Sequence, residues 1–241
     1  MLRFFALLTL VVLTSLTACT KIHDPLPGFP KLVLWAWERP ENLSYLVPSS
    51  TGVAYLADTI SFESDGLHRR PRFQPLRVPA GTSLISVIRI ESRSPLRPPV
   101  GDVVNEILRV VAHRQIRAVQ MDYDARASER VYYRDLMQAI RGKLPRKVAL
   151  EMTALVSWCQ GDDWIHSMPV VDAVPMFFRM GADPHSTRER LREPLCESGI
   201  GISTDEFYVP VPRGKRVYVF ADRPWTEITY RAVLQASRRW S

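Results

Sequence analysis

The sequence of 241 residues lacks several of the short motifs that identify a chemistry. It contains no Gly-rich phosphate-binding loop and no Gly-x-Ser-x-Gly nucleophile elbow. Its five histidines show no spacing typical of metal ligands, and no pair of cysteines stands at zinc-site spacing. We therefore expect neither a serine hydrolase nor an open dinucleotide-binding sheet, and we predict no metal and no organic cofactor.

The amino-terminal segment lacks a hydrophobic run long enough for a stable transmembrane helix. The apolar run from Phe4 to Leu13 is shorter than the roughly 20 residues that such a helix needs. Arg3 precedes the run and small residues follow it, which predicts a secretory signal peptide over residues 1–18. Leu16-Thr17-Ala18-Cys19 resembles the bacterial lipobox. The resemblance implies that Cys19 is diacylated and becomes the first mature residue; an ordinary signal peptide with a chance cysteine is the alternative.

The residue after Cys19 bears on the destination of the protein. It is Thr20 and not Asp, which by the sorting rule of enteric lipoproteins implies the outer membrane. We predict a bacterial envelope protein that is lipid-anchored through Cys19, at the outer membrane and facing the periplasm. Residues 19–30 are rich in proline and aperiodic, and they predict an anchor and an extended tether that keeps the domain within roughly 35 Å of the bilayer.

Cysteine is rare, with three residues in the chain. Cys159 and Cys196 remain once Cys19 is assigned to the anchor, and an oxidising periplasm permits a disulfide between them. Because the geometry of two loops is not readable from sequence, a Cys159–Cys196 bridge and a pair of separate thiols both stay open.

Charge is unbalanced, with a formal net charge of +7 that is carried mostly by arginine. Such a balance favours anionic partners such as nucleic acid, lipid headgroups or acidic polysaccharide. The basic residues are scattered along the chain and no nucleic-acid-binding motif is present, so we do not expect a nucleic-acid partner.

The periodicity of the remaining chain predicts an α/β fold, a small (β/α)8 TIM-type barrel in one domain over residues 31–241. An Asp65-Gly66 turn followed by a proline- and arginine-rich segment predicts that a β-hairpin replaces the second helix. We expect strands over residues 31–37, 51–62, 84–91, 116–124, 148–156, 173–180, 200–203 and 217–221. We expect helices over residues 103–113, 128–144 (capped by Ser128), 162–168, 187–192 and 226–240.

The segment Ala118–Arg126 carries the candidate site. Side chains alternate between the faces of a strand, so Val119, Met121 and Tyr123 share one face and Gln120, Asp122 and Asp124 share the other. In an α/β barrel the inner face opens at the carboxyl ends of the strands, where sites are built. We therefore expect Asp122 and Asp124 at a barrel mouth.

Other charged and aromatic residues fall near predicted strand ends. Arg89 and Arg179 are expected to face Asp122, Asp124 and Glu151, because charges inside apolar strands must be paired. In one interpretation the acids serve a sugar site as catalytic groups and Trp37 and Trp225 stack on pyranose rings. In the other, the acids only neutralise arginines; a carboxylate-bound metal on Asp122 and Asp124 is a minor third possibility.

Five motifs in order resemble the bacterial family called domain of unknown function 3142. The resemblance covers nearly all of the mature chain and implies a periplasmic or lipoprotein barrel without an established activity. The motifs are Trp35-Ala36-Trp37-Glu38-Arg39-Pro40-Glu41, Val119-Gln120-Met121-Asp122-Tyr123-Asp124-Ala125, Thr153-Ala154-Leu155-Val156-Ser157-Trp158-Cys159, Val174-Pro175-Met176-Phe177-Phe178-Arg179-Met180-Gly181 and Arg223-Pro224-Trp225.

A looser resemblance is to chitinase-type glycoside hydrolases, whose fourth strand ends in alternating acids with a glutamate as the last member and proton donor. Asp122 and Asp124 match the two preceding acids, but the donor position falls on Arg126, which cannot act as an acid near neutral pH. The resemblance implies a glycosidase-like lipoprotein that binds or hydrolyses a glycan, with Asp124 as the main group, Asp122 in support and Glu151 as the alternative acid. A catalytically inert barrel that serves as an envelope binding or scaffold module is the alternative.

Overall fold

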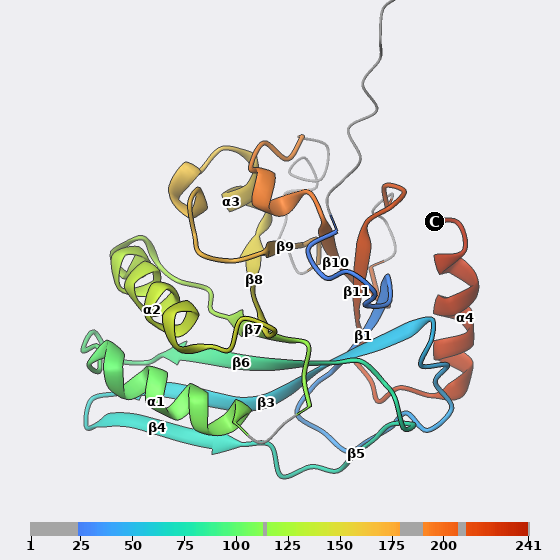
Figure 1. Cartoon of the computed structure of the whole chain (residues 1–241), viewed down its shortest axis with the longest axis horizontal. Helices are drawn as coiled ribbons and strands as arrows, with labels where there is room; N and C mark the ends of the chain where they lie inside the picture. Colours follow the sequence, from blue (N-terminus) through green and yellow to red (C-terminus); the bar gives the residue numbers. More distant parts are fainter. Residues whose placement is uncertain (1–23, 113–114, 179–189, 207–210, 241) are drawn as a thin grey trace, which may run out of the picture.

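A computed structural model of the chain describes residues 24–112, 115–178, 190–206 and 211–240. Eight parallel strands close into a barrel (Figure 1), which confirms the predicted α/β fold. Around the barrel they are β1 (Leu32–Ala36), β11 (Arg216–Phe220), β10 (Gly199–Ser203), β9 (Asp172–Met176), β8 (Ala149–Leu155), β7 (Ala118–Asp122), β6 (Leu84–Ser92) and β3 (Thr51–Glu63), and β3 pairs with β1 to close the ring.

The long strand β3 explains how a hairpin takes the place of the second helix. Its first part, Thr51 to Tyr55, pairs with β1, and its second part, Asp58 to Glu63, pairs antiparallel with β4 (Gly66–Pro71). On its other edge β3 pairs with β6, and the register of that pairing shifts between Leu56 and Asp58. The shift falls where the partner on the first edge changes from β1 to β4, as expected of a bulge that bends a strand. Arg69 on β4 bonds Asp58 and also pairs with Glu106 of the next helix at 2.9 Å, so the hairpin is fastened to the barrel.

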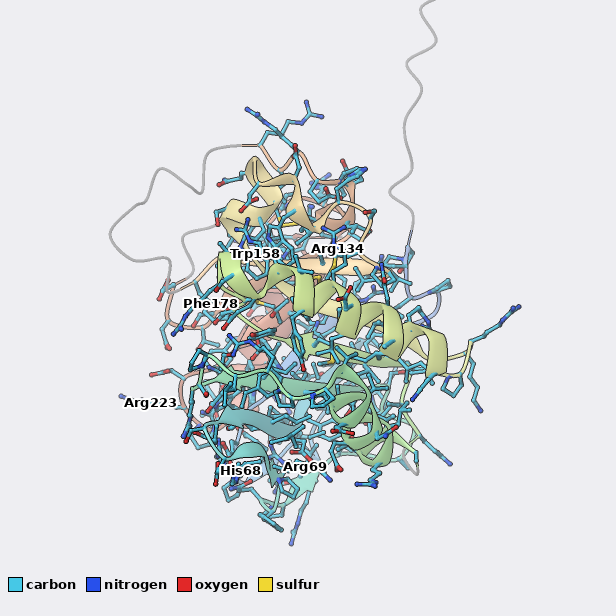
Figure 2. All side chains as sticks on the ribbon, turned by 90° about the vertical axis from the view of Figure 1, so that its left-hand side faces the viewer. His68, Arg69, Arg134, Trp158, Phe178 and Arg223 are labelled. Carbon is cyan, nitrogen blue, oxygen red and sulfur yellow. A yellow bond between two sulfur atoms is a disulfide. The ribbon has the colours of Figure 1, made fainter. Side chains whose placement is uncertain are left out.

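Helices cover only part of the barrel. Helix α1 (Val100–Val111) follows β6 and packs against α2 (Arg130–Lys143), which follows β7. Helix α4 (Glu227–Ser237) follows β11 (Figure 1), while a short helix α3 (Val156–Gln160) follows β8. The hairpin with His68 and Arg69 lies at one end of the molecule, and Trp158 and Arg134 lie at the other (Figure 2). The remaining described elements are the short strands β2 (Glu41–Asn42) and β5 (Leu76–Arg77) and the 3-10 turns η1 (Ala127–Glu129), η2 (Asp163–Ile165) and η4 (Pro194–Cys196).

Two apolar layers follow from the alternation of the strands. Leu32 and Leu34 of β1 pack outward under the helices, whereas Val33 and Trp35 fill the barrel interior. The predicted alternation of β7 is confirmed: Val119 and Met121 join the outer layer. Within the described part of the chain, no helix has the length and apolar character needed to cross a bilayer.

Several local predictions are corrected. Ser128 does not cap α2; instead η1 precedes that helix, and the Glu129 carboxylate accepts from the backbone N–H of Arg126 at 2.8 Å. Residues 162–168 hold only the 3-10 turn η2. Of the helix expected over residues 187–192, the described residues 190–192 are not helical. Val131 on α2 and Ile228, both apolar residues inside the predicted helices, are 74% and 81% exposed and do not face the barrel.

The tether expected over residues 20–30 is also shorter than predicted. Its described part, residues 24–30, packs onto the barrel, with Leu26 and Phe29 each 4% exposed. Arg216 on β11 holds this segment, because its guanidinium donates to Asp24 Oδ1 at 2.8 Å and to the carbonyls of Leu26 and Pro30. Residues 24–30 are therefore part of the folded domain and not of a free tether.

Candidate functional site

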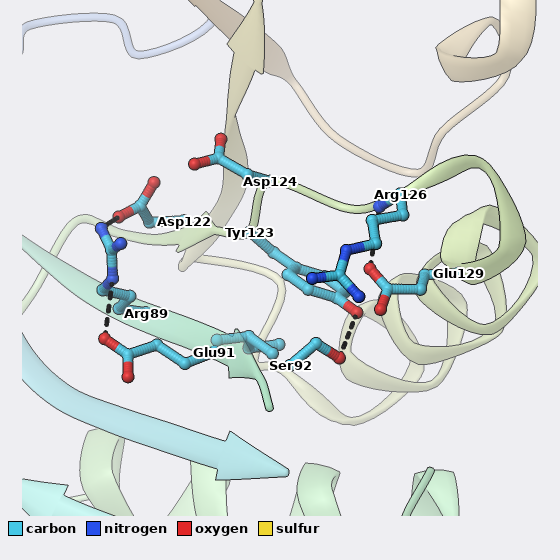
Figure 3. A pocket seen from close by; sticks show the side chains of 9 residues that line it. Arg89, Glu91, Ser92, Asp122, Tyr123, Asp124, Arg126 and Glu129 are labelled. Carbon is cyan, nitrogen blue, oxygen red and sulfur yellow. Dashed lines mark hydrogen bonds and ion pairs between the residues drawn. The ribbon is translucent and has the colours of Figure 1, made fainter. Parts of the chain in front are cut away.

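A small pocket of about 160 Å³ opens at the carboxyl ends of β6 and β7. The loop after β7 supplies the outer wall, which carries Asp124, Arg126 and Glu129 (Figure 3). The lining residues share a polar or charged character with one exception, and they are Arg89, Ile90, Glu91, Ser92, Asp122, Tyr123, Asp124, Arg126 and Glu129. A pocket at the carboxyl ends of barrel strands is where α/β barrels place their sites.

Asp122 is the buried anchor of the pocket. Its Oδ2 accepts from Arg89 Nη1 at 3.2 Å, and its Oδ1 accepts from Thr153 Oγ1 on β8 at 2.9 Å. Burial raises the pKa of Asp122 and the nearby Asp124 adds to the rise, while Arg89 and Thr153 oppose it. With both oxygens already bonded, Asp122 orients its neighbours and is poorly placed to give a proton to a ligand.

Asp124 differs from Asp122 in its surroundings. Two residues further along the chain, it lies beyond the end of β7 and is exposed. Within the described part of the chain its carboxylate makes no hydrogen bond or ion pair, and it lies on the side of the loop that carries Asp122 (Figure 3). The pocket thus offers a ligand one unoccupied acceptor group at its rim.

The other two acids of the pocket are held as carboxylates by arginines. Burial would raise the pKa of Glu91, but its hydrogen bond to Arg93 and the charges of Arg93 and Arg89 hold that pKa below its usual value. Glu129 behaves in the same way: burial would raise its pKa, but the Arg126 backbone N–H, the hydroxyls of Tyr123 and Ser92 and the charge of Arg97 together hold that pKa below its usual value. Glu129 also bonds Arg97. Neither acid is prepared to act as a proton donor near neutral pH.

Aromatic side chains gather beside the pocket. Trp37 is half-buried, and the Arg89 guanidinium lies 5.3 Å from its ring centroid. Trp37 contacts Trp35 and Phe220 edge-on, and Phe178 stacks on Phe220 at 5.4 Å. Arg89 therefore joins an acidic pocket to an aromatic cluster at the barrel mouth. The roles of Phe178 and Phe220 are not apparent from the sequence, because each is part of an ordinary apolar run.

Glu151 and Trp225 do not reach this pocket. Glu151 is fully buried one layer deeper, two residues before Thr153 on β8, and accepts from Tyr218 Oη at 3.0 Å. Trp225 is 4% exposed and its indole N–H donates to the carbonyl of Trp35. Their placement removes Glu151 as an alternative acid for a ligand in the pocket and Trp225 as a stacking platform. Arg179 lies outside the described residues.

Of the two alternatives that the sequence left open for Cys159 and Cys196, the structure shows the bridge. Cys159 at the end of α3 and Cys196 in η4 are joined as a disulfide with their Cα atoms 5.9 Å apart. Both are buried, so the bridge fastens the loop after β8 to the segment before β10. Among the described residues no group of three or more histidine, cysteine, aspartate or glutamate side chains is arranged to hold a metal.

The fold and the pocket together define a TIM-type α/β barrel with a mixed-charge pocket at the carboxyl ends of its strands. Comparisons with models of protein families, with curated proteins and with solved structures found no match. The likenesses to domain of unknown function 3142 and to chitinase-type hydrolases therefore stay predictions from the sequence motifs.

Proposed function

We propose that the protein is a bacterial envelope lipoprotein whose barrel binds a glycan at the Asp124 pocket without cleaving it. The observation that carries the proposal is the unoccupied, exposed Asp124 carboxylate beside Arg89 and the half-buried Trp37. Sugars are bound by carboxylates that accept from hydroxyl groups and by aromatic rings that pack against pyranose faces. The pocket supplies the carboxylate, Trp37 beside Arg89 supplies the ring, and Arg126 and Ser92 add donors.

The same pocket argues against hydrolysis. Glycoside hydrolysis by the usual route needs one carboxylic acid that donates a proton and a second carboxylate close to it. In this pocket the expected donor position is Arg126, Glu91 and Glu129 are held ionised, and Asp122 has both oxygens bonded. An inert barrel that acts as a scaffold is the second candidate, and the chain of ion pairs through Glu91, Arg89 and Asp122 favours it.

Changing the charge at Asp124 separates these candidates. We expect Asp124→Asn to weaken binding to the best ligand of a glycan panel by about tenfold or more, since a hydrogen bond to a charged group contributes about 1.5–3 kcal/mol. Trp37→Ala is expected to weaken binding as well. The measurements are affinity on the panel and release of reducing sugar.

Asp135→Asn, an exposed aspartate on α2, is the matched control and should leave affinity unchanged. If no glycan binds the wild-type protein, the scaffold candidate replaces the proposal. Release of sugar by the wild type that is lost in Asp124→Asn would instead make the protein a hydrolase.

The lipid anchor at Cys19 is a separate prediction with its own measurement. Cells that express the protein are labelled with a radioactive fatty acid, and the chain is expected to carry label that Cys19→Ala abolishes, because the thiol is the acylated atom. The same cells, fractionated, should hold the labelled protein in the outer membrane. Label that persists in Cys19→Ala would contradict the anchor.

A further inference from the structure

We propose that the amino-terminal end of the barrel is a docking surface for an anionic membrane leaflet. Because all eight barrel strands are parallel, the residues that precede them gather at one end, opposite the pocket. Those residues are rich in lysine and arginine. The basic residues of this end, here called the basic end, are Lys31 before β1, Arg117 before β7, Arg146 and Lys147 before β8, Arg213 and Lys215 before β11, and Arg238 and Arg239 after α4.

Hydrogen bonds bring these residues together around the segment 24–30. Arg117 Nη2 donates to the carbonyl of Pro27 at 2.9 Å, and Lys31 Nζ lies 3.0 Å from Asp24 Oδ2. The backbone N–H of Ala149 bonds the carbonyl of Arg117, so the loop with Arg146 and Lys147 lies beside Arg117. The Gly214 N–H bonds the carbonyl of Trp240, which places the end of α4 beside the turn before β11.

The acids of this end do not balance the charge. Asp24 is already paired with both Arg216 and Lys31. Among the described residues that precede the strands, a second carboxylate is that of Glu197, which is exposed in the segment before β10. In the part of the chain that the structure describes, the exposed Arg117, Arg146 and Lys147 pair with no acidic side chain, so a net positive surface remains. Clustered basic residues at a membrane surface are attracted to anionic headgroups.

The path of the chain favours a bilayer as the occupant over a soluble polyanion. The packed segment 24–30 leaves the barrel at the basic end, so only residues 20–23 separate the domain from Cys19. Four residues reach at most about 15 Å, close enough for the basic end to touch headgroups. The choice of a bilayer rests on the proposed anchor at Cys19, whereas the charge attraction itself needs no acyl chain and can be tested without it. Docking in this way turns the Asp124 pocket away from the bilayer.

The test uses a chain that starts at Thr20 and so contains every described element of the barrel without the acylation site. Cosedimentation is measured with vesicles of phosphatidylglycerol in phosphatidylcholine and with vesicles of phosphatidylcholine alone. We expect binding only to the anionic vesicles, and weaker binding at high salt. Arg146→Glu/Lys147→Glu should lower the partition coefficient at least about tenfold, because each basic residue near such a surface contributes about a factor of five.

The matched control is Arg77→Glu/Arg223→Glu, which makes the same change in net charge with exposed residues that lie outside the basic end. It should bind anionic vesicles within about twofold of the wild type, and thermal unfolding should show that both double variants fold. Three results would overturn the inference: equal loss in both variants, binding to neutral vesicles, or tighter binding to single-stranded DNA than to anionic vesicles. The last result would assign the surface to nucleic acid.

Discussion

Arg216→Met is expected to destabilise the barrel by about 3–5 kcal/mol, the cost of removing one partner from a buried charge network. Arg216 is fully buried and donates to Asp24 and to the carbonyls of Leu26 and Pro30. Methionine fills a similar volume but supplies none of these hydrogen bonds and no positive charge. The free energy of unfolding is measured with urea near neutral pH.

The loss of Arg216 has a second, local consequence. Without its guanidinium, the segment 24–30 keeps the apolar contacts of Leu26 and Phe29 and two exposed polar contacts, from Arg117 to Pro27 and from Lys31 to Asp24. Proteolysis near this segment should therefore accelerate in the variant before the barrel unfolds. Arg223→Met replaces an exposed arginine and should change stability by less than about 0.5 kcal/mol. A change below about 1 kcal/mol in Arg216→Met would show that the network is not what holds the segment.

Glu151→Gln is expected to change how stability depends on pH. Burial raises the pKa of Glu151 to about 7, against the charge of Arg216 and the hydrogen bond from Tyr218. Because the folded-state pKa lies above the unfolded value, the contribution to stability is complete below about pH 4.5 and is lost as pH rises through about 7. The shift corresponds to on the order of 3 kcal/mol. Glutamine stays neutral at every pH and does not lose this contribution. Between pH 5 and pH 8 the free energy of unfolding of the variant should therefore rise relative to that of the wild type by on the order of 3 kcal/mol.

Asp172 titrates together with Glu151 and must be included in the comparison. It is fully buried, and burial and the charge of Glu151 raise its pKa well above the usual value. In Glu151→Gln the pKa of Asp172 should fall, because the neighbouring negative charge is gone. The variant should then also lose less stability through Asp172 as the pH rises. Glu227→Gln, at an exposed ion pair with Arg231 on α4, is the control. A difference between Glu151→Gln and the wild type that does not change with pH would contradict the buried carboxyl pair.

The two predictions concern a deep layer of buried polar residues, which is distinct from the residues at the barrel mouth. Glu151, Asp172, Tyr218 and Arg216 belong to the deep layer, whereas Asp122, Asp124 and Arg89 belong to the mouth. The deep acids do not line the described pocket, so we expect their effect to be on stability. Substitutions in the deep layer should change stability, and substitutions at the mouth should change binding, which allows the two kinds of effect to be separated.

The sequence by itself determined the barrel, the hairpin after the second strand and the two faces of β7. These features follow from local patterns: strand alternation fixes which side chains point inward, and the Asp65-Gly66 turn with a proline-rich return excludes a helix. The pairing of Arg89 with Asp122 was also predictable, because unpaired charges inside an apolar strand are costly.

Only the tertiary structure decided which inward residues reach a ligand. Glu151 and Asp122 look alike in the sequence, but the register of β7 and β8 pairs Glu151 with Gln120, one layer below Asp122. Trp225 and Trp37 both follow barrel strands, yet one is buried against the Trp35 carbonyl and the other lies beside Arg89. The role of residues 24–30 was hidden for the same reason, since a proline-rich segment looks like a tether until a buried arginine elsewhere in the chain is found to bind its carbonyls. Strand register and long-range hydrogen bonds join residues far apart in the chain, and no local pattern records them.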